Sequence, residues 1–269
     1  MSENIIKQTR AEYDQLDRVN PSSLMYALTS RKHYWTYCNG QIEHRPSPAM
    51  EIGTLAHALI LEPNTTDFAY WTGKVRRGKE WDEFQLEHAG QVIVRQKDMD
   101  IAARIAEAVR GHDTAAALLA TCHTEMTIKH DWQIDGEHVL RCKGRIDAIC
   151  PTHLVDVKTA GDIRPREFGR QCANLRYNVR LACYRYWYEQ ETDNSPNVYL
   201  IAVENTPPYD VVVYHVPDQF LDSGLTEAER GARLVCWGLK DDAWPGIAEK
   251  VQALEVPLWA MPDEELVGF

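Results

Sequence analysis

The spacing of apolar residues changes about halfway along the chain. Before residue 121 the apolar positions recur at helical spacing, and they predict helices at 21–38, 51–61, 81–90, 97–109 and 115–120, with a basic loop at 73–80. After it, alternation predicts strands at 125–134 and 139–149, joined by a hairpin turn at Asp135-Gly136. A short strand at 154–158, helices at 165–175, 179–190 and 219–239, and strands at 197–204 and 209–216 complete the expected order.

This order favours an α/β fold with a mixed central β-sheet flanked by helices, because the strands do not alternate regularly with helices. The 269 residues are 44% hydrophobic, which is enough for a substantial core. We expect a single domain over residues 1–269. Its N-terminal part is helical to about residue 120, its core spans about 121–250, and an irregular tail covers 251–269.

Charge and cysteine content narrow the class of protein. The net charge of -11 argues against a surface that is basic throughout, although it permits a local basic groove. Seven irregularly spaced cysteines with no C-x-x-C pair favour neither a zinc ribbon nor a disulfide framework, so we expect reduced, mostly buried thiols. The N-terminal MSENIIKQTR lacks the apolar stretch of a signal peptide, and no run of 18 apolar residues suggests a membrane span. These features predict a cytoplasmic protein.

The candidate chemistry lies in the segment RCKGRIDAICPTHLVDVKT, residues 141–159. If Ile149 and Leu154 flank the turn, continuing the register places Asp147 opposite Asp156, with side chains roughly 5 Å apart. Facing carboxylates repel each other unless a positive charge lies between them, and hard oxygen ligands suit Mg²⁺, with Mn²⁺ as a substitute. Lys158 projects from the same face of its strand as Asp156.

Two carboxylates and one ammonium on a rigid surface are the groups that phosphodiester hydrolysis requires. The metal lowers the pKa of a bound water and neutralises charge in the transition state, and the lysine orients the water or stabilises charge. The sequence therefore predicts a metal-dependent nuclease. A D-x-K pattern alone would instead favour a solvated strand face with an Asp–Lys ion pair.

The motif G-R-I-D followed by V-D-V-K-T resembles the core of PD-(D/E)XK nucleases. Most of the chain more closely resembles the RecE-type exonuclease VIII family of phages and prophages. Further matching motifs are P-S-S-L-M at 21–25, G-T-L-A-H at 53–57, R-R-G-K-E-W at 76–81 and W-P-G at 244–246.

The resemblance implies a processive 5′-to-3′ exonuclease acting on the ends of double-stranded DNA. Its products would be mononucleotides and a 3′ single-stranded tail for recombination by annealing. It also implies Mg²⁺, a ring-shaped homo-tetramer and an annealing protein as a possible partner. The iron–sulfur cluster of some broader relatives is not expected, because Cys236 is the only cysteine in the C-terminal region where theirs cluster.

Carried onto this chain, the resemblance makes Asp147 and Asp156 metal ligands and Lys158 the catalytic lysine. His57 becomes a further ligand, although outside its G-T-L-A-H context it would be an ordinary polar helix residue. Glu125 opens a strand where relatives also carry an acid. It could support the site or bind a second metal, or it could be a solvated strand end.

The helix after the catalytic strands departs from the family pattern Q-x-x-x-Y. Tyr184 matches the tyrosine and is a candidate catalytic residue, but Arg180 stands where glutamine is expected. Arginine could contact a phosphate with its charge, or it could compete with the metal.

Six arginines and a single acid, Glu167, occupy residues 164–185 of this acidic protein. Phosphate contact explains such a concentration, and ion pairs with neighbouring subunits or loops are the alternative. The candidate DNA-binding residues are Arg76, Arg77, Lys79, Arg164, Arg166, Arg170, Arg176 and Arg180.

Two other functions remain open from the sequence. A non-catalytic or weakly active DNA-binding recombination module would explain Arg180. A structure-specific endonuclease could use the same core and the same acids.

Overall fold

A six-stranded sheet forms the centre of the protein in the computed structural model, which describes residues 2–42, 47–63, 68–89, 91–257 and 260. The strand order is β1-β4-β5-β6-β7-β8, in which only β6 and β7 pair in parallel. This arrangement confirms the expected α/β fold with a mixed sheet. The strands are β1 (Ile5–Lys7), β4 (His123–Gln133), β5 (Val139–Ile149), β6 (His153–Ala160), β7 (Asn197–Glu204) and β8 (Val211–His215).

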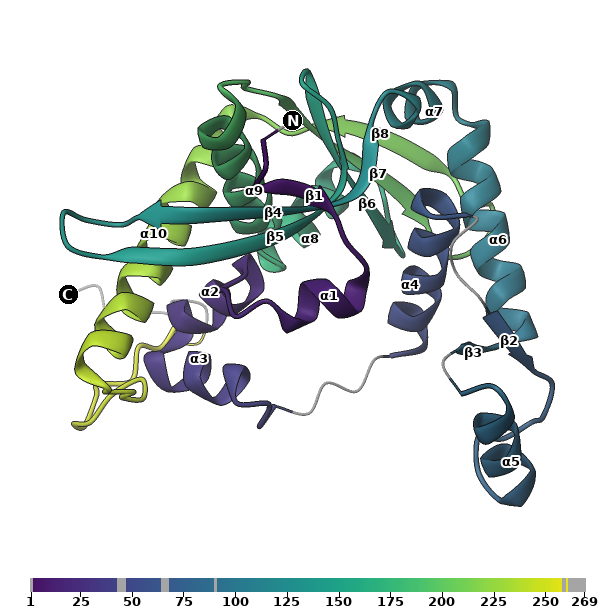
Figure 1. Cartoon of the computed structure of the whole chain (residues 1–269), viewed down its shortest axis with the longest axis horizontal. Coiled ribbons are helices and arrows are strands. Elements are labelled where there is room, and N and C mark those ends of the chain that lie inside the picture. The colour runs from purple at the N-terminus through teal and green to yellow at the C-terminus, as the bar shows by residue number, and fades with distance from the viewer. Residues whose placement is uncertain (1, 43–46, 64–67, 90, 258–259, 261–269) are drawn as a thin grey trace, which may run out of the picture.

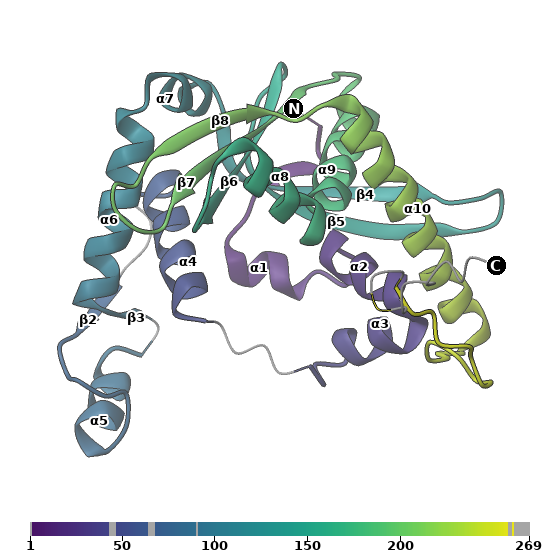
Figure 2. The ribbon, with the colours of Figure 1, turned by 180° about the vertical axis from the view of Figure 1, so that it is seen from behind.

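Helices cover both faces of this sheet (Figures 1 and 2). One apolar core joins the sheet to α2 (Pro21–Thr29), α9 (Tyr177–Thr192) and α10 (Asp218–Asp241). The other joins it to α4 (Pro48–Leu61), α6 (Gln96–Gly111) and α7 (Asp113–Ala120). Strand alternation separates the two cores, since Leu200 belongs to the first and its neighbour Ile201 to the second.

The remaining elements connect or extend these layers. Because β6 and β7 are parallel, the chain must cross over between them, and it does so through α8 (Pro165–Asn174) and α9. A separate two-stranded sheet of β2 (Phe68–Trp71) and β3 (Val92–Arg95) carries α5 (Lys79–Glu87), which projects away from the body (Figure 1). The short helices α1 (Arg10–Gln15) and α3 (Arg31–Cys38) precede and follow α2 in the sequence.

A buried lysine holds α1 against the sheet. Lys143 on β5 is only 6% exposed, and its Nζ donates hydrogen bonds to the carbonyl oxygens of Tyr13 and Leu16, both at 2.8 Å. Nζ also lies 4.7 Å from the centre of the Tyr13 ring. The ammonium thus gives each of these carbonyl groups at the end of α1 a second donor, besides the amides of Leu16 and Arg18.

The hairpin registers expected from the sequence are confirmed. Gln133 pairs with Val139 across the turn at residues 135–136, and Ile149 pairs with Leu154 across the next turn. The expected helices at 97–109, 115–120, 165–175, 179–190 and 219–239 correspond to α6, α7, α8, α9 and α10.

Several element boundaries were wrong. The expected helix 21–38 is two helices, because Ser30 is extended (φ -169°, ψ 161°) and caps α3 by accepting a hydrogen bond from the His33 amide. The basic loop at 73–80 ends early, since α5 begins at Lys79. Helix α4 begins three residues before the expected start, at Pro48, where Ser47 caps it and proline suits the first turn.

Other differences concern short strands. The strands β1, β2 and β3 have only three or four residues and were not expected, because so short a segment shows no alternation. Strand β8 begins at Val211 rather than at residue 209. Tyr209 has a positive φ of 61°, which is incompatible with the extended backbone of a strand. Residues 251–257 of the expected tail have no regular structure, and most of 258–269 lies outside the described residues. Among the helices that the structure describes, none is both long enough and apolar enough for a membrane crossing.

Candidate active site

Three acidic residues lie in one row across adjacent strands: Glu125 on β4, Asp147 on β5 and Asp156 on β6. The β4–β5 register places Glu125 at the level of Asp147. The β5–β6 pairing ends at Ala148–Val155, and Asp147 and Asp156 are the next residues on the two strands. All three are buried, with relative exposures of 6%, 8% and 2%. Three buried carboxylates cannot share a row unless positive charge compensates them.

The regular sheet is interrupted at this row. Glu125 has a φ of 53°, a left-handed conformation that costs a non-glycine residue about 1–3 kcal/mol. Ile146 and Ala148 are two residues apart and would share a face of a regular strand, yet they belong to opposite cores. The Asp147 carboxylate accepts a hydrogen bond from the Val157 amide at 2.8 Å, so this side chain serves as the amide's acceptor. At this interruption the Asp147 carboxylate is therefore directed toward the backbone of β6.

His57 on α4 joins two of the acids. Its Nε2 lies 2.8 Å from Asp147 Oδ2, and its Nδ1 lies 3.1 Å from Glu125 Oε1. Helix α4 reaches this position because Gly53, one turn earlier, lets the helix approach β6. A Cβ atom at Gly53 would lie 2.8 Å from Thr159 Oγ1. The G-T-L-A-H motif therefore combines a close helix–strand contact with the histidine that the contact positions.

Lys158 and Arg145 supply further positive charge. The Lys158 ammonium forms an ion pair with Asp156, lies 4.0 Å from Asp147 Oδ2, and packs 5.5 Å from the centre of the Tyr177 ring. Arg145 forms an ion pair with Glu125. Protein cations thus already lie beside all three carboxylates, so the acidic row by itself does not require a metal ion.

These contacts change the protonation equilibria. Burial opposes protonation of His57, but the Asp147 and Glu125 carboxylates outweigh it and raise the pKa of His57 to about 10. Burial alone would raise the pKa of Asp147, yet the charges of His57 and Lys158 hold it below its usual range. Burial and the Asp147 charge raise the pKa of Asp156. The two carboxyl groups are therefore shifted in opposite directions, a pattern common at functional sites.

The donor set suits a divalent cation. One donor atom each from His57, Glu125 and Asp147 lies within 4.8 Å of the others. Two carboxylates and an imidazole are ligands that Mn²⁺ accepts readily, and carboxylates with water suit Mg²⁺. The structure thus brings Glu125 into the group with His57 and Asp147, whereas the sequence left open support for the site, a second metal and a solvated strand end. Asp156 lies in the same row and pairs with Lys158.

Helix α9 presents two more of the expected residues to this region. Arg180 lies close enough to Asp156 and Asp147 for its charge to interact with both, and its guanidinium is 3.4 Å from Ser22 Oγ. Tyr184 is 7% exposed and packs over Gly144 of β5, where an added Cβ would lie 2.6 Å from the ring. Arg180 is thus placed to act on the acids, whereas the Tyr184 ring fills the space above β5.

The candidate DNA-binding residues fall into two separate groups. Arg76, Arg77 and Lys79 lie at or before the start of the projecting helix α5, where Arg76 is 3.5 Å from Glu51 and Lys79 is 3.7 Å from Glu83. The second group lies on α8 and α9 or just before them, and three of its arginines pair with acids. These pairs are Arg164–Asp162, Arg170–Glu167 and Arg176–Glu227. Arg166 is exposed on α8.

Arg145 and Tyr177 contact the site but were not assigned roles from the sequence. Arg145 lies two residues before Asp147 on the same strand, and this spacing within G-R-I-D could have identified it. Tyr177 comes to Lys158 only through the crossover after β6, so no local sequence pattern indicates its contact.

Comparison with known proteins agrees with this architecture. A family model described as "PDDEXK-like domain of unknown function (DUF3799)" matches residues 21–257. A solved structure from Eubacterium rectale, titled "Putative exonuclease", superposes with a TM-score of 0.65 at 14% identity, covering 94% of this chain and 96% of that chain. At that identity the likeness concerns the fold. The structure titled SSO0001 covers 79% of this chain and 84% of its own at 11% identity, but its TM-score of 0.31 carries no weight. No curated protein matches this chain.

Proposed function

Because the chain belongs to the family of PDDEXK-like domains, we propose that it is a metal-dependent nuclease that degrades linear double-stranded DNA from its ends. The observation that carries the proposal is the buried row of Glu125, Asp147 and Asp156, with His57 and Lys158 directly beside it. The resemblance to RecE-type exonucleases adds the direction, 5′ to 3′. It also adds the products, which are mononucleotides and a 3′ single-stranded tail for annealing.

Each residue has a role that follows from its contacts. His57, Glu125 and Asp147 would hold the cation, with Asp156 as a further ligand from the same row. A divalent cation bound there supplies a water of lowered pKa and neutralises charge that develops on the phosphate. The Lys158 ammonium can hydrogen-bond to the attacking water or to a phosphate oxygen, and the Tyr177 ring limits its movement. The Val157 amide keeps the Asp147 carboxylate in place.

The basic residues are proposed to contact the DNA backbone. Several arginines of α8 and α9 already pair with carboxylates, so DNA binding would exchange those partners for phosphates. Such contacts weaken with salt, because phosphate binding releases counterions. We extend the proposal to a ring-shaped homo-tetramer around the DNA. Native mass spectrometry should then give four times the 30.8 kDa mass of one chain.

The test uses linear duplex DNA labelled at one 5′ or one 3′ end, incubated with Mg²⁺ or Mn²⁺. We expect label to leave the 5′ end first, as mononucleotide, while closed circles stay intact. In Asp156→Asn and Lys158→Met, cleavage should fall by at least about 100-fold, because each loses charge at the reacting centre. Duplex binding should remain. Asp135→Asn is the matched control, since Asp135 lies in the exposed β4–β5 turn.

Each alternative has its own outcome in this assay. Cutting of closed circles would indicate a structure-specific endonuclease on the same core. Release from the 3′ end would contradict the proposed direction. Full cleavage by Asp156→Asn would remove Asp156 from the site, and with it the main support for the proposal.

A weakly active DNA-binding module is the second candidate function, and Arg180 is the observation that favours it. Its guanidinium adds a positive charge beside Asp156 and Asp147, where the family pattern has a neutral glutamine. If this charge weakens cation binding, Arg180→Gln should lower the Mg²⁺ concentration needed for half-maximal cleavage. Slower cleavage in Arg180→Gln would instead indicate that the arginine contacts the substrate.

A further inference from the structure

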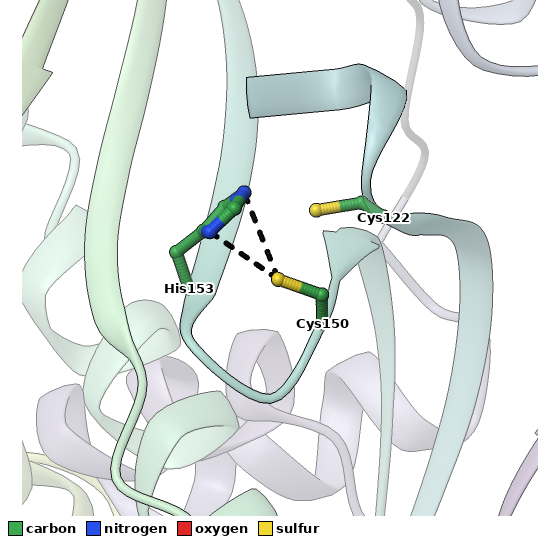
Figure 3. Close-up of side chains that lie close together, drawn as sticks. All are labelled: Cys122, Cys150 and His153. Atoms are coloured by element: carbon green, nitrogen blue, oxygen red, sulfur yellow. Dashed lines mark hydrogen bonds between the residues drawn. The ribbon is translucent and has the colours of Figure 1, made fainter. Parts of the chain in front are cut away.

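A second group of side chains that could hold a metal ion lies at the β5–β6 turn, beyond the ends of the strand segments that carry the acids. Cys122 directly precedes β4, Cys150 directly follows β5, and His153 is the first residue of β6. One donor atom from each lies within 4.8 Å of the others. Figure 3 shows both sulfur atoms and the imidazole ring directed toward one another from three separate segments.

The distance between Cys150 Sγ and Nδ1 of His153 is close to that between two ligands of a tetrahedral metal ion. Cys150 Sγ lies 3.2 Å from Nδ1 of His153 and 3.7 Å from Nε2. Zinc–sulfur and zinc–nitrogen bonds of about 2.3 and 2.0 Å place tetrahedral ligand atoms roughly 3.5–3.8 Å apart. Cys150 Sγ and Nδ1 are thus close to the required separation, and Cys122 Sγ lies within 4.8 Å of both residues' donor atoms. Rotation of the two cysteine side chains would bring the three donors onto one ion.

The histidine ring is oriented as in known metal sites. Nε2 of His153 lies 3.0 Å from the carbonyl oxygen of Leu118 in α7. A carbonyl only accepts hydrogen bonds, so Nε2 carries the proton and Nδ1 keeps its lone pair. Nδ1 lies 3.0 Å from Thr152 Oγ1 and 3.2 Å from Cys150 Sγ. A metal-binding histidine usually donates its second ring N–H to such a carbonyl, which fixes both tautomer and orientation. This contact does not involve the cysteines, and it indicates Nδ1 as the nitrogen that would bind the metal.

We propose that Cys122, Cys150 and His153 form a structural Zn²⁺ site with two thiolates and one imidazole nitrogen, and a water as the fourth ligand. Binding releases the two thiol protons, so the zinc and its two thiolates are together neutral. Soft sulfur ligands favour Zn²⁺ over Mg²⁺, whereas the carboxylates of the acidic row favour hard cations. Cys122 and His153 are partly exposed, so the ion can enter from solvent.

The position of the proposed zinc site indicates a structural role. Each ligand lies three residues along its strand from one acid, as Cys122 from Glu125, Cys150 from Asp147 and His153 from Asp156. Three residues of strand span roughly 10 Å. A zinc ion here ties together the ends of the three strands that carry the acids, next to the place where Glu125 adopts its strained conformation. It stabilises their mutual register without taking part in chemistry.

The first test is a titration of reduced, metal-free full-length protein with Co²⁺, which reports its ligands by absorption. We expect one equivalent to give a thiolate-to-cobalt charge-transfer band with the visible bands of tetrahedral Co²⁺. Zn²⁺ should remove these bands at one equivalent, and excess Mg²⁺ should leave them unchanged. Zn²⁺ should also raise the melting temperature, because it binds the folded state.

Variants then assign the ligands. Cys122→Ser and Cys150→Ser should each lower Co²⁺ affinity by at least about tenfold and weaken the charge-transfer band. Cys236→Ser removes a buried thiol of α10 and should keep the band, as should Asp147→Asn in the acidic row. Circular dichroism identifies any variant that fails to fold. Cys122 is only partly buried, so Cys122→Ser remains informative if the buried Cys150→Ser does not fold.

Three results would overturn the proposal. One is a wild-type protein that shows no thiolate-to-cobalt band, and another is a band that persists unchanged in folded Cys122→Ser. The third is a Cys122–Cys150 disulfide, detected by mass as the loss of two hydrogens, in protein purified under reducing conditions. The Co²⁺ spectrum reports this site whether or not the protein cleaves DNA.

Discussion

A methyl group added at Gly53 tests whether the close approach of α4 to β6 positions the candidate active site. The new Cβ in Gly53→Ala would lie 2.8 Å from Thr159 Oγ1, closer than normal van der Waals contact. His57 follows four residues later on the same helix. A shift of α4 would therefore move the imidazole relative to Asp147 and Glu125, which it contacts at 2.8 and 3.1 Å.

The expected size of the effect comes from two opposing contributions. Replacing glycine by alanine inside a helix stabilises it by about 1 kcal/mol when the methyl group has room. Overpacking at a close contact costs about 1–3 kcal/mol. We therefore expect Gly53→Ala to change the unfolding free energy by between roughly zero and a loss of 2 kcal/mol. Gly169→Ala in α8 is the control, because no described atom lies within 4 Å of its added Cβ, and it should gain about 1 kcal/mol.

Urea denaturation of both variants, in buffer with EDTA, measures these free energies. The double variant Gly53→Ala/Thr159→Ala removes the oxygen that the methyl group would meet, and Thr159→Ala alone completes the cycle. We expect a favourable coupling of about 1–2 kcal/mol between the two substitutions. With Mg²⁺ and linear duplex DNA, Gly53→Ala should cleave about 10–100-fold more slowly, because a shift of roughly 1 Å costs that much in rate.

Stabilisation of the protein by Gly53→Ala to the same extent as by Gly169→Ala would contradict a positioning role for the α4–β6 contact. That result would mean that α4 moves away from β6 at no cost. Normal cleavage together with a clear loss of stability would separate the packing role of Gly53 from the placement of His57.

Two further predictions concern contacts outside the acidic row. Lys143→Met should lower the unfolding free energy by about 1–3 kcal/mol in urea denaturation, because two hydrogen bonds from a charged donor to the carbonyls of Tyr13 and Leu16 are lost; an unchanged midpoint would contradict this. Burial raises the pKa of Glu191, but its hydrogen bonds, led by that to His130, outweigh burial and lower it. The stabilisation from ionised Glu191 is therefore present above about pH 4.3 and lost as pH falls through the folded-state pKa. Glu191→Gln should be less stable than wild type at pH 7, and denaturation at pH 3 should show a smaller difference.

The hairpins were predictable because local patterns specify them. Alternation defines β4 and β5, and the short turn between Ile149 and Leu154 leaves one sensible register, which the structure confirms. Lys158 follows Asp156 by two residues, so its proximity to that carboxylate also follows from strand geometry. The short strands β1, β2 and β3 depend instead on partners distant in sequence, and no local pattern indicates them.

The residues of the candidate active site could be predicted only in part from the sequence. Regular strand geometry predicts a plain pair of Asp147 and Asp156, but the Asp147 carboxylate accepts a hydrogen bond from the Val157 amide, and Glu125 interrupts regular strand backbone on β4. The group with donor atoms in ligand range consists of His57, Glu125 and Asp147. Their roles as ligands stay a prediction. The resemblance pointed to His57, whereas its distance from the acids follows from how α4 packs.

The Cys122–Cys150–His153 group was also predictable from the sequence only in part. Irregular spacing excluded a zinc ribbon, and C-x-x-H at Cys150 and His153 is the only local signal of a ligand pair. Cys122 joins them because β4 and β5 pair along their full length, which brings the start of one strand to the end of the other.

By itself, the amino-acid sequence determined the strand order within the hairpins and the alternation that buries Val155 and Val157, and it supplied the candidate acids and lysine. These properties depend on residues within a few positions of one another, where chain geometry leaves little freedom. Tertiary structure alone decided that His57 lies between Glu125 and Asp147, and that Arg180 faces Asp156. Those contacts require helices packed on the sheet at a particular depth, and close approaches such as that of Gly53 to Thr159 set that depth.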